Sequence, residues 1–330
     1  MTATKSLTSQ SPAAIAEQAE LPVTIITPPR GWQLLNLREL WQFRELLLFL
    51  TWRDVMVRYK QTVLGVAWAI LQPAMMMVIF TVFLGQMAGV GSGDYPYPVF
   101  VYAGLLLWTF FATAISNAGA SVVGSAQMVS KIYLPRLLIP LAAVAAAVVD
   151  FFIAFLLLAG LMVYYRICPG WAILLVPLVL ALAVLAAVGV GALLAALNVA
   201  YRDFKYTIPF LVQIWMFATP SIYMNVEAHE AAAVETQATA AASPAADADG
   251  AVPAHSGVGR GPGNTMVPSW VKTVLRLNPM TDLISFFRAA VLGGPLPWAR
   301  LGTSVAVILA FFVAGLMYFR RVESTFADII

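Results

Sequence analysis

Asp150 is the residue whose type and position first suggest chemistry. It is an ionisable side chain inside an apolar stretch long enough to cross a bilayer. A carboxylate at the centre of such a helix costs about 2.5–3.5 kcal/mol, so it must meet a polar partner or water. Two interpretations stay open: Asp150 pairs with Ser116 or Asn117 of the preceding apolar stretch, or it lines a polar pathway. A proton relay is disfavoured, because the apolar stretches hold no further acid or histidine.

The residues that nucleotide, metal or covalent chemistry needs are missing from the sequence. No lysine follows a glycine, which excludes the phosphate-binding motif GxxxxGK[ST]. Cys168 is the single cysteine, which excludes an internal disulfide and a cysteine-based metal site. Both histidines, His229 and His255, lie in a stretch rich in Ala and Gly. We therefore expect no enzyme, and the energy for uphill movement must come from another chain or an ion gradient.

The elements that carry these residues are expected to be membrane-spanning helices. Apolar residues make up 61% of the chain and charged residues 11%, against about 25% charged in a soluble domain. A spanning helix needs roughly 20 apolar residues, and six segments meet or approach that length. These segments are 63–88, 98–120, 137–165, 171–197, 207–224 and 301–319. The fold class is therefore expected to be all-α and integral to the membrane, with six transmembrane helices, the first of them kinked at Pro73.

The distribution of Lys and Arg predicts the orientation of these spans. With the N-terminus inside, the inner segments hold roughly twice as many basic residues as the outer ones, as the positive-inside rule requires. Residues 1–30 also lack the apolar core of a secretory signal. Both termini are therefore expected in the cytoplasm.

The segment 37–60 precedes the first span and is too charged to cross a bilayer. At helical spacing one face collects Leu37, Trp41, Leu48, Trp52, Val55 and Tyr59. Arg38, Glu39, Arg53 and Lys60 lie roughly opposite. This pattern is typical of an amphipathic helix in the membrane interface. Two roles stay open, a simple anchor and a lateral gate that reads lipid headgroups.

Two loops are long enough to hold structure of their own. In the inner loop 121–136, residues 127–133 could form a short helix that Pro135 stops, either as a connector or as a docking surface for a cytoplasmic partner. In the last outer loop, residues 226–265 have no apolar periodicity and are expected to be disordered. The next stretch, 267–295, holds two short amphipathic pieces around Asn278, too short to span. They predict two re-entrant or interfacial helices at a pore mouth, with a plain surface hairpin as the alternative.

Aromatic side chains gather near the ends of the spans, Trp215 and Tyr223 among them. Membrane-interface belts explain such residues, and flat rings also make platforms for sugars; both interpretations stay open. The whole chain then divides into seven parts. They are a disordered tail 1–36, the interfacial helix 37–61, spans one to five in 62–225, the insert 226–265, the re-entrant helices 266–297, span six in 298–320 and a cytoplasmic tail 321–330.

Several long stretches, in order, resemble the polysaccharide and polyol-phosphate export permeases of the type-2 ABC transporters. The first is RDVMVRYKQTVLGVAWAILQPAMMMVIFTVFLG at 53–85. The others lie at 97–143, 148–158, 197–223, 277–293 and 318–330. The resemblance covers the chain from about residue 37 to its end except for 226–265, where related chains turn quickly. We expect that insert to be dispensable.

The resemblance implies roles for residues that the pattern alone does not assign. The family's coupling helix, which meets the ATPase, falls on Gln127, Met128, Ser130, Lys131, Tyr133 and Arg136. Its inner-leaflet contact with a lipid diphosphate would fall on Arg53, Arg58 and Lys60. Its outer gate would include Trp270, Asn278, Pro279, Phe287 and Arg288. Asp150, Asn117, Trp215 and Tyr223 remain candidates for the pathway or for polar pairing inside the membrane.

The resemblance further implies a homodimer that associates with two separate ABC ATPase subunits. ATP and Mg would be bound by those partners, with no cofactor or metal in this chain and no nucleic acid. The substrate would be a polyprenyl-diphosphate-linked polysaccharide, O-antigen-like or teichoic-acid-like, exported across the inner (plasma) membrane. The alternatives are a type-2 ABC permease for a drug or small lipid and a membrane-embedded glycan polymerase or ligase.

Overall fold

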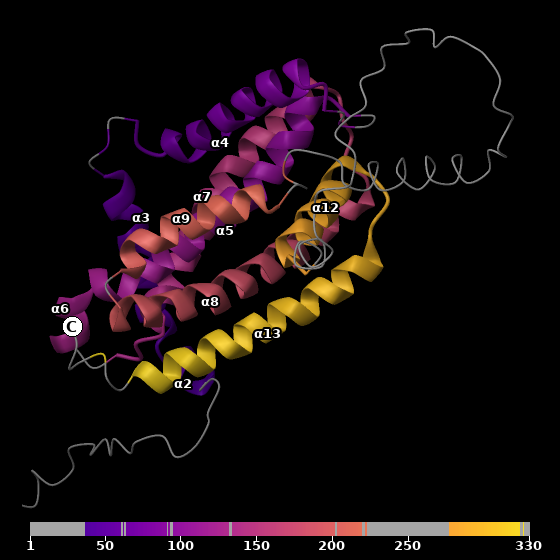
Figure 1. Ribbon diagram of the computed structural model, residues 1–330. Helices are drawn as coiled ribbons and strands as arrows, with labels where there is room; N and C mark the ends of the chain where they lie inside the picture. The colour runs from indigo at the N-terminus through magenta and orange to yellow at the C-terminus, as the bar shows by residue number, and fades with distance from the viewer. Residues whose placement is uncertain are drawn as a thin grey trace, which may run out of the picture. The chain divides into compact units, whose positions relative to one another are not determined.

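Figure 1 shows the computed structural model of the chain. The structure describes residues 37–60, 62, 64–90, 92, 95–131, 134–201, 203–219, 222, 277–323 and 326. The chain divides into two units, Met1–Gln33 and Leu34–Ile330, and every described helix belongs to the second. The expected tail 1–36, the insert 226–265 and the first short outer piece lie outside the described residues.

All regular elements within the described ranges are helices, which confirms the all-α prediction for that part of the chain. The N-terminal helices are α2 (Leu37–Gln42), α3 (Arg44–Tyr59), α4 (Ala67–Phe80), the π-helix η2 (Thr81–Met87), α5 (Tyr97–Gly124) and α6 (Ala126–Lys131). The remainder are α7 (Leu138–Tyr164), the 3-10 helix η3 (Trp171–Leu175), α8 (Val176–Ala200), α9 (Phe204–Phe217), α12 (Pro279–Leu292) and α13 (Trp298–Glu323).

Five helical segments are long and apolar enough to cross a membrane. They are Ala67–Met87, Tyr97–Gly124, Leu138–Tyr164, Trp171–Ala200 and Trp298–Glu323. The sixth expected span, 207–224, coincides with α9, which has 14 described residues and contains Pro209. A 14-residue helix rises only about 21 Å, less than the hydrocarbon thickness of about 30 Å. The count of six spans therefore stays a prediction.

Helix α5 occupies the centre of the bundle. Of its apolar stretch 78% is buried within the protein, against 6% for the span formed by α4 and η2. It contacts α4, α7, α8, α9 and α12, and its large side chains Phe100, Phe111 and Ile115 are almost fully enclosed. The hydrophobic core is therefore built around α5, and α4 is attached at its edge.

Helices α8 and α13 lie side by side along much of their length (Figure 1). Glycine makes this close approach possible, because a Cβ atom on Gly315 would lie 2.0 Å from the carbonyl oxygen of Gly189. A Cβ atom on Gly189 would in turn lie 2.5 Å from Cα of Phe312. Backbone-to-backbone contact at small residues is the usual way for membrane helices to pack.

The hydrogen-bond ladder of the first span is interrupted twice. Pro73 lies inside α4, where it has no N–H to donate to the carbonyl of Ala69. Eight residues later the α-helix becomes the π-helix η2, which begins at Thr81. The buried hydroxyl of Thr81 makes no hydrogen bond with any described residue. Such wide turns are frequently found at functional sites.

The expected helix over 37–60 is present but broken at Phe43, which separates α2 from α3. Leu50 and Val55 are buried, and Leu50 clusters with Leu138 of α7. The residues of the predicted apolar stripe do not share one environment: Val55 packs inward, whereas Trp41, Leu48 and Trp52 are exposed. Placement of these exposed side chains in the membrane interface stays a prediction.

Candidate functional site

Helices α3, α4, α5 and α7 surround a cavity of about 330 Å³. Its apolar wall includes Trp68 of α4, Phe110 of α5 and Phe151 of α7. Seven lining residues are polar: Arg58, Tyr59, Gln72, Thr109, Thr113, Asn117 and Asp150. The cavity therefore contains the intramembrane acid that the sequence singled out, together with Asn117.

Asp150 is held by two consecutive residues from the C-terminal end of α3. Arg58 donates through Nη1 to Oδ2 of Asp150, and the Tyr59 hydroxyl donates to Oδ1. The Asp150 side chain is 17% exposed and that of Arg58 28% exposed. The expected pairing with Ser116 or Asn117 is therefore wrong, because the partners of the carboxylate come from α3. Asp150 also lines the cavity, and a role in a polar pathway stays a prediction.

Tyr59 remains a hydrogen-bond donor at any physiological pH. Burial and the hydrogen bond to the Asp150 carboxylate together raise the pKa of Tyr59 to about 12. The neutral hydroxyl therefore keeps its proton and its bond to Asp150.

Four polar side chains of the cavity have no hydrogen-bond partner among the described residues. Gln72, Thr109, Thr113 and Asn117 make no hydrogen bond within the part of the chain that the structure describes. Polar groups without partners are costly in hydrocarbon and are tolerated beside water or a polar ligand. The four groups line one hollow and leave its wall with free hydrogen-bonding capacity.

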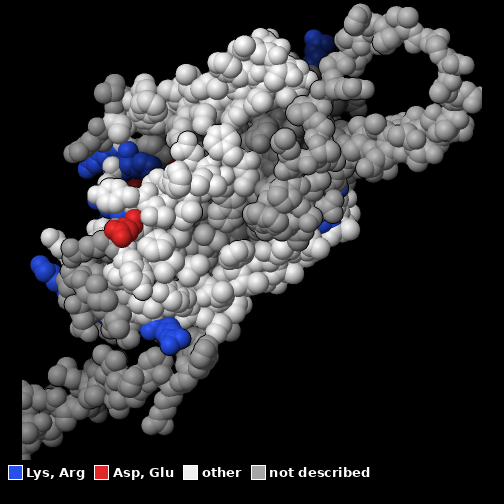
Figure 2. Space-filling view, viewed as in Figure 1, with Lys and Arg blue, Asp and Glu red and all other residues white. Residues whose placement is uncertain are grey.

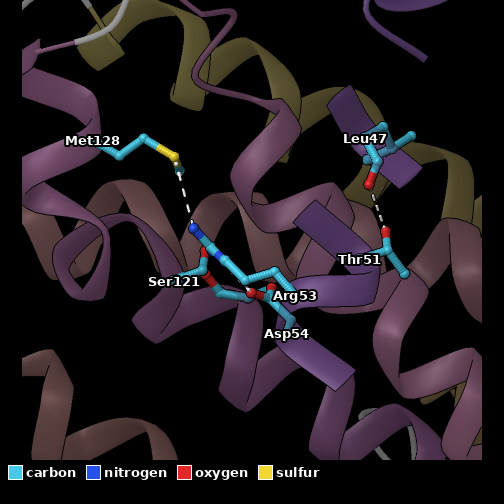
Figure 3. Close-up of polar contacts among 7 residues, drawn as sticks. Leu47, Thr51, Arg53, Asp54, Ser121 and Met128 are labelled. Atoms are coloured by element: carbon cyan, nitrogen blue, oxygen red, sulfur yellow. Dashed lines mark hydrogen bonds and ion pairs between the residues drawn. The ribbon is translucent and has the colours of Figure 1, made fainter. Parts of the chain in front are cut away.

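The three basic residues proposed for a lipid diphosphate do not form one cluster. Only Arg58 reaches the cavity, where Asp150 balances its charge. Arg53 lies about 140° away around α3, bridges Asp54 at 2.8 Å and donates to Sδ of Met128 at 3.7 Å (Figure 3). Lys60 is exposed at the C-cap of α3.

The candidates for coupling separate into exposed and internal residues. Gln127 and Lys131 of α6 are exposed, whereas Met128 is half-buried and packs against the cluster of Leu50 and Leu138. Most basic side chains visible in Figure 2 gather at the end of the molecule where Figure 1 places α3 and α6. Tyr133 and the side chain of Ser130 lie outside the described residues.

Arg136, the last of these candidates, joins the start of α7 to the end of α13. Its Nη1 donates to the carbonyl oxygen of Glu323, and its backbone N–H donates to Oε1 of Glu323 at 3.3 Å. Its guanidinium carbon lies 5.9 Å from the ring centre of Phe326. Its contacts are therefore internal to this chain.

At the opposite end, the predicted gate residue Asn278 is hydrogen-bonded to the predicted pathway residue Trp215. Its Oδ1 caps α12 by accepting from the N–H of Met280 at 3.1 Å, and it also accepts from Nε1 of Trp215 at 3.0 Å. Its Nδ2 donates to Oγ1 of Thr219 at 2.8 Å and to the carbonyl oxygen of Ala218 at 3.1 Å. Asn278 therefore ties the end of α9 to the start of α12, where Pro279 is the first helical residue.

Arg288 is the innermost charged residue of α12 and is 7% exposed. Its Nε donates to the carbonyl oxygen of Phe100 at 3.1 Å, and its Nη2 donates to that of Ile222 at 3.2 Å. The guanidinium lies 3.5 Å from the ring centre of Phe100, a favourable cation–π arrangement. A side chain at Gly104 would displace it, because a Cβ atom there would lie 2.6 Å from Nη2.

These contacts decide one alternative for the outer piece 279–292. Phe287 is fully buried with its ring 6.1 Å from that of Phe151, and α12 packs against α5, α8 and α13. A plain surface hairpin is therefore wrong for this piece. Its re-entrant placement stays a prediction, and Trp270 and Tyr223 lie outside the described residues.

Sequence reasoning missed Tyr59 as a partner of Asp150 and missed three of the cavity's polar residues. A signal was present for two of them, because Thr109, Thr113 and Asn117 recur every fourth residue and so share one face of α5. Gln72, which precedes Pro73, belongs to no such pattern.

A family model for ABC-2 type transporters matches residues 45–226, more than half of the 330 residues. The chain belongs to the ABC-2 type transporter family. The match runs from α3 past α9 and includes every residue of the cavity. This ABC-2 chain is accordingly a multi-pass membrane protein of a transporter family rather than an enzyme.

Curated relatives of this ABC-2 chain carry one name. Two O-antigen export system permease proteins RfbA from Klebsiella pneumoniae are 23% identical over 290 and 292 residues, which cover 87% of this chain and 95% of theirs. The protein of the same name from Myxococcus xanthus is 28% identical over 186 residues, covering 56% of this chain and 71% of that protein. These similarities confirm the resemblance to the export permeases.

Proposed function

We propose that this chain is the membrane-spanning permease subunit of an ATP-driven exporter for a lipid-linked polysaccharide, O-antigen-like or teichoic-acid-like. It moves its substrate from the cytoplasmic to the outer face of the inner (plasma) membrane. The observation that carries the proposal is the family match over 45–226, joined to near full-length similarity to proteins named O-antigen export permeases. The main alternative is an ABC-2 permease for a drug or a small lipid.

The proposed assembly contains two copies of this chain and two ABC ATPase subunits that bind ATP and Mg. The sequence supports a separate motor because it lacks the GxxxxGK[ST] motif. Helix α6 supports docking at the basic end, where Gln127 and Lys131 are exposed. Both termini lie on that side in the proposed orientation, since basic residues concentrate in cytoplasmic segments.

The outer end of the pathway is closed, in this proposal, by α12. Asn278 links α12 to α9, and Arg288 links it to α5. Both connections are made of hydrogen bonds between separate helices, so they can break and re-form without unfolding a helix. Opening for the glycan would require these bonds to exchange.

Gene deletion followed by localisation of the polymer tests the proposed function. Because synthesis precedes transport, we expect lipid-linked glycan to accumulate at the cytoplasmic face and to disappear from the cell surface. Re-introduction of the intact gene should reverse both effects. Loss of the glycan without accumulation would contradict export and favour a synthetic role. Normal surface glycan, with changed tolerance to a toxic compound, would favour the drug or small-lipid alternative.

A further inference from the structure

The cavity between α3, α4, α5 and α7 has the chemistry of a site for a neutral, hydroxyl-rich ligand. We propose that it is a sugar subsite, which holds one sugar of the glycan through amide and hydroxyl groups on α4 and α5. This inference rests on the proposed function for the identity of the ligand. Its structural basis is independent and consists of charge, unused hydrogen-bonding groups and an exposed ring.

The charge of the cavity disfavours an anion. Among the described lining residues only Arg58 and Asp150 have charged side chains, and they pair with each other. Tyr59 adds a neutral hydroxyl that is bound to the same carboxylate. A phosphate group entering here would compete with Asp150 for Arg58 and leave one buried charge unpaired, which is costly. A sugar imposes no such cost, because it carries no charge.

The unused hydrogen-bonding groups match the surface of a sugar. Gln72 and Asn117 each supply an amide, which donates and accepts, and Thr109 and Thr113 each supply a hydroxyl. None of the four is bound to a protein group within the described ranges. They come from two facing helices, α4 and α5, so they can reach a ligand from two sides. A lipid acyl chain would leave all four unsatisfied.

A half-exposed indole adds the apolar contact that sugars also need. Trp68 lines the cavity one helical turn before Gln72 and is 50% exposed. The flat face of an indole fits the C–H face of a pyranose ring, while the amide one turn away can reach the sugar's hydroxyl edge. A volume of about 330 Å³ has room for one pyranose together with water.

Lipid probes with and without a sugar separate recognition of the sugar from recognition of the lipid headgroup. The permease and its ATPase would be purified as the intact complex in nanodiscs. Binding would be measured for polyprenyl diphosphate that carries one hexose or one N-acetylhexosamine, and for bare polyprenyl diphosphate. The test variant is Thr113→Val with Asn117→Leu, which keeps the branched shape of both side chains and removes the hydrogen-bonding groups. Trp68→Leu is a second, independent variant at a half-exposed position that tolerates change, and Ser116→Ala is the control on the same helix.

We expect the wild type to bind a sugar-bearing probe more tightly than the bare probe. In the double variant the affinity for the sugar-bearing probes should fall about tenfold, as expected for the loss of two hydrogen bonds. Trp68→Leu should have an effect of similar size. Binding of the bare probe should stay unchanged in both variants, and Ser116→Ala should match the wild type with all probes.

Three results would overturn the inference, and they differ in whether the proposed function survives. Equal weakening of sugar-bearing and bare probes would show that the cavity reads the lipid diphosphate. Unchanged preference in both variants, with the wild type preferring the sugar, would reject this site and leave the proposed function intact. Failure of the wild type to prefer any sugar-bearing probe would reject the subsite, and normal surface glycan after gene deletion would separately reject the proposed function.

Discussion

At the scale of single residues, the pairing of Asp150 joins two parts of the chain with different environments. The carboxylate belongs to a spanning helix, and both of its donors belong to the charged helix that precedes the first span. Removing one member of such a pair leaves a charge in a poorly solvated site, which costs more than the pair contributes. The contact therefore fixes the end of α3 to α7.

A double-mutant cycle on Arg58 and Asp150 measures this attachment. Arg58→Ala and Asp150→Ala should each lower the melting temperature of the purified protein by several degrees. The double variant should be no less stable than the worse single variant, which gives a coupling of about 1–2 kcal/mol. This value is below that of a fully buried pair because the two side chains are 28% and 17% exposed. Arg53→Ala is the matched control, and its effect should add to that of Asp150→Ala. Additive effects for Arg58 and Asp150 would contradict the attachment.

Because a carboxylate in an apolar helix is costly in free energy, the sequence predicted that Asp150 has a polar partner. It could not predict which residue that partner is. Arg58 lies 92 residues away, so the pairing depends on how α3 packs, which is a tertiary property. Helical spacing predicted a helix over 37–60 from local pattern alone. The same pattern could not say which side of α3 meets the bundle: Leu50, which lies away from the predicted stripe, is buried, because α3 packs against α7 on that side.

At the scale of helices, hydrophobic length predicted five spans well, because length and apolar content are local properties of the sequence. The placement of the short apolar run in α12 could not be predicted, because these local properties do not say what surrounds a helix. A run of that length has one pattern whether it lies on a surface or inside a bundle. Only the contacts of Phe287 and Arg288 show that α12 is enclosed.

The contact between α8 and α13 gives a test at this scale. Gly315→Ala would place a methyl group against the backbone of Gly189, which cannot rotate away as a side chain can. We expect the two helices to separate and the free energy of unfolding to fall by about 1–3 kcal/mol, as for other overpacked interiors. Gly302→Ala lies on the same helix with nothing within 4 Å of the added carbon, and it should be neutral or slightly stabilising. Equal thermal stability of the two variants would show that the helices do not meet at Gly315.

At the scale of the whole molecule, basic charge and exposed α6 residues occupy the same end of the bundle (Figure 2). The internal residues of that end, Met128 and Arg136, contact α3 and α13 of the same chain. A partner that docks there would therefore contact Gln127 and Lys131 first. A displacement of α6 would be transmitted to α3 through the contact between Met128 and Arg53.

Charge reversal at α6 tests this arrangement through the partner. Lys131→Glu should reduce the amount of ABC ATPase that co-purifies with the permease, by several-fold at low salt, because an exposed contact is sensitive to charge and to screening. Folding should be unaffected, since Lys131 is exposed. Arg321→Glu changes an exposed charge at the end of α13 and serves as the comparison. Full co-purification and full transport in Lys131→Glu would remove α6 from the docking surface.

The two interruptions in the first span have a mechanical consequence. Between Pro73 and Thr81 lie about two regular helical turns, with an interrupted hydrogen-bond ladder at each end. Little of this span is buried against the rest of the protein. A π turn holds about one residue more than an α turn, so tightening η2 by one residue would swivel everything beyond it by about 100°. The ring of Tyr97 lies against Gly85 of η2, so such a rotation would change the contact between η2 and α5.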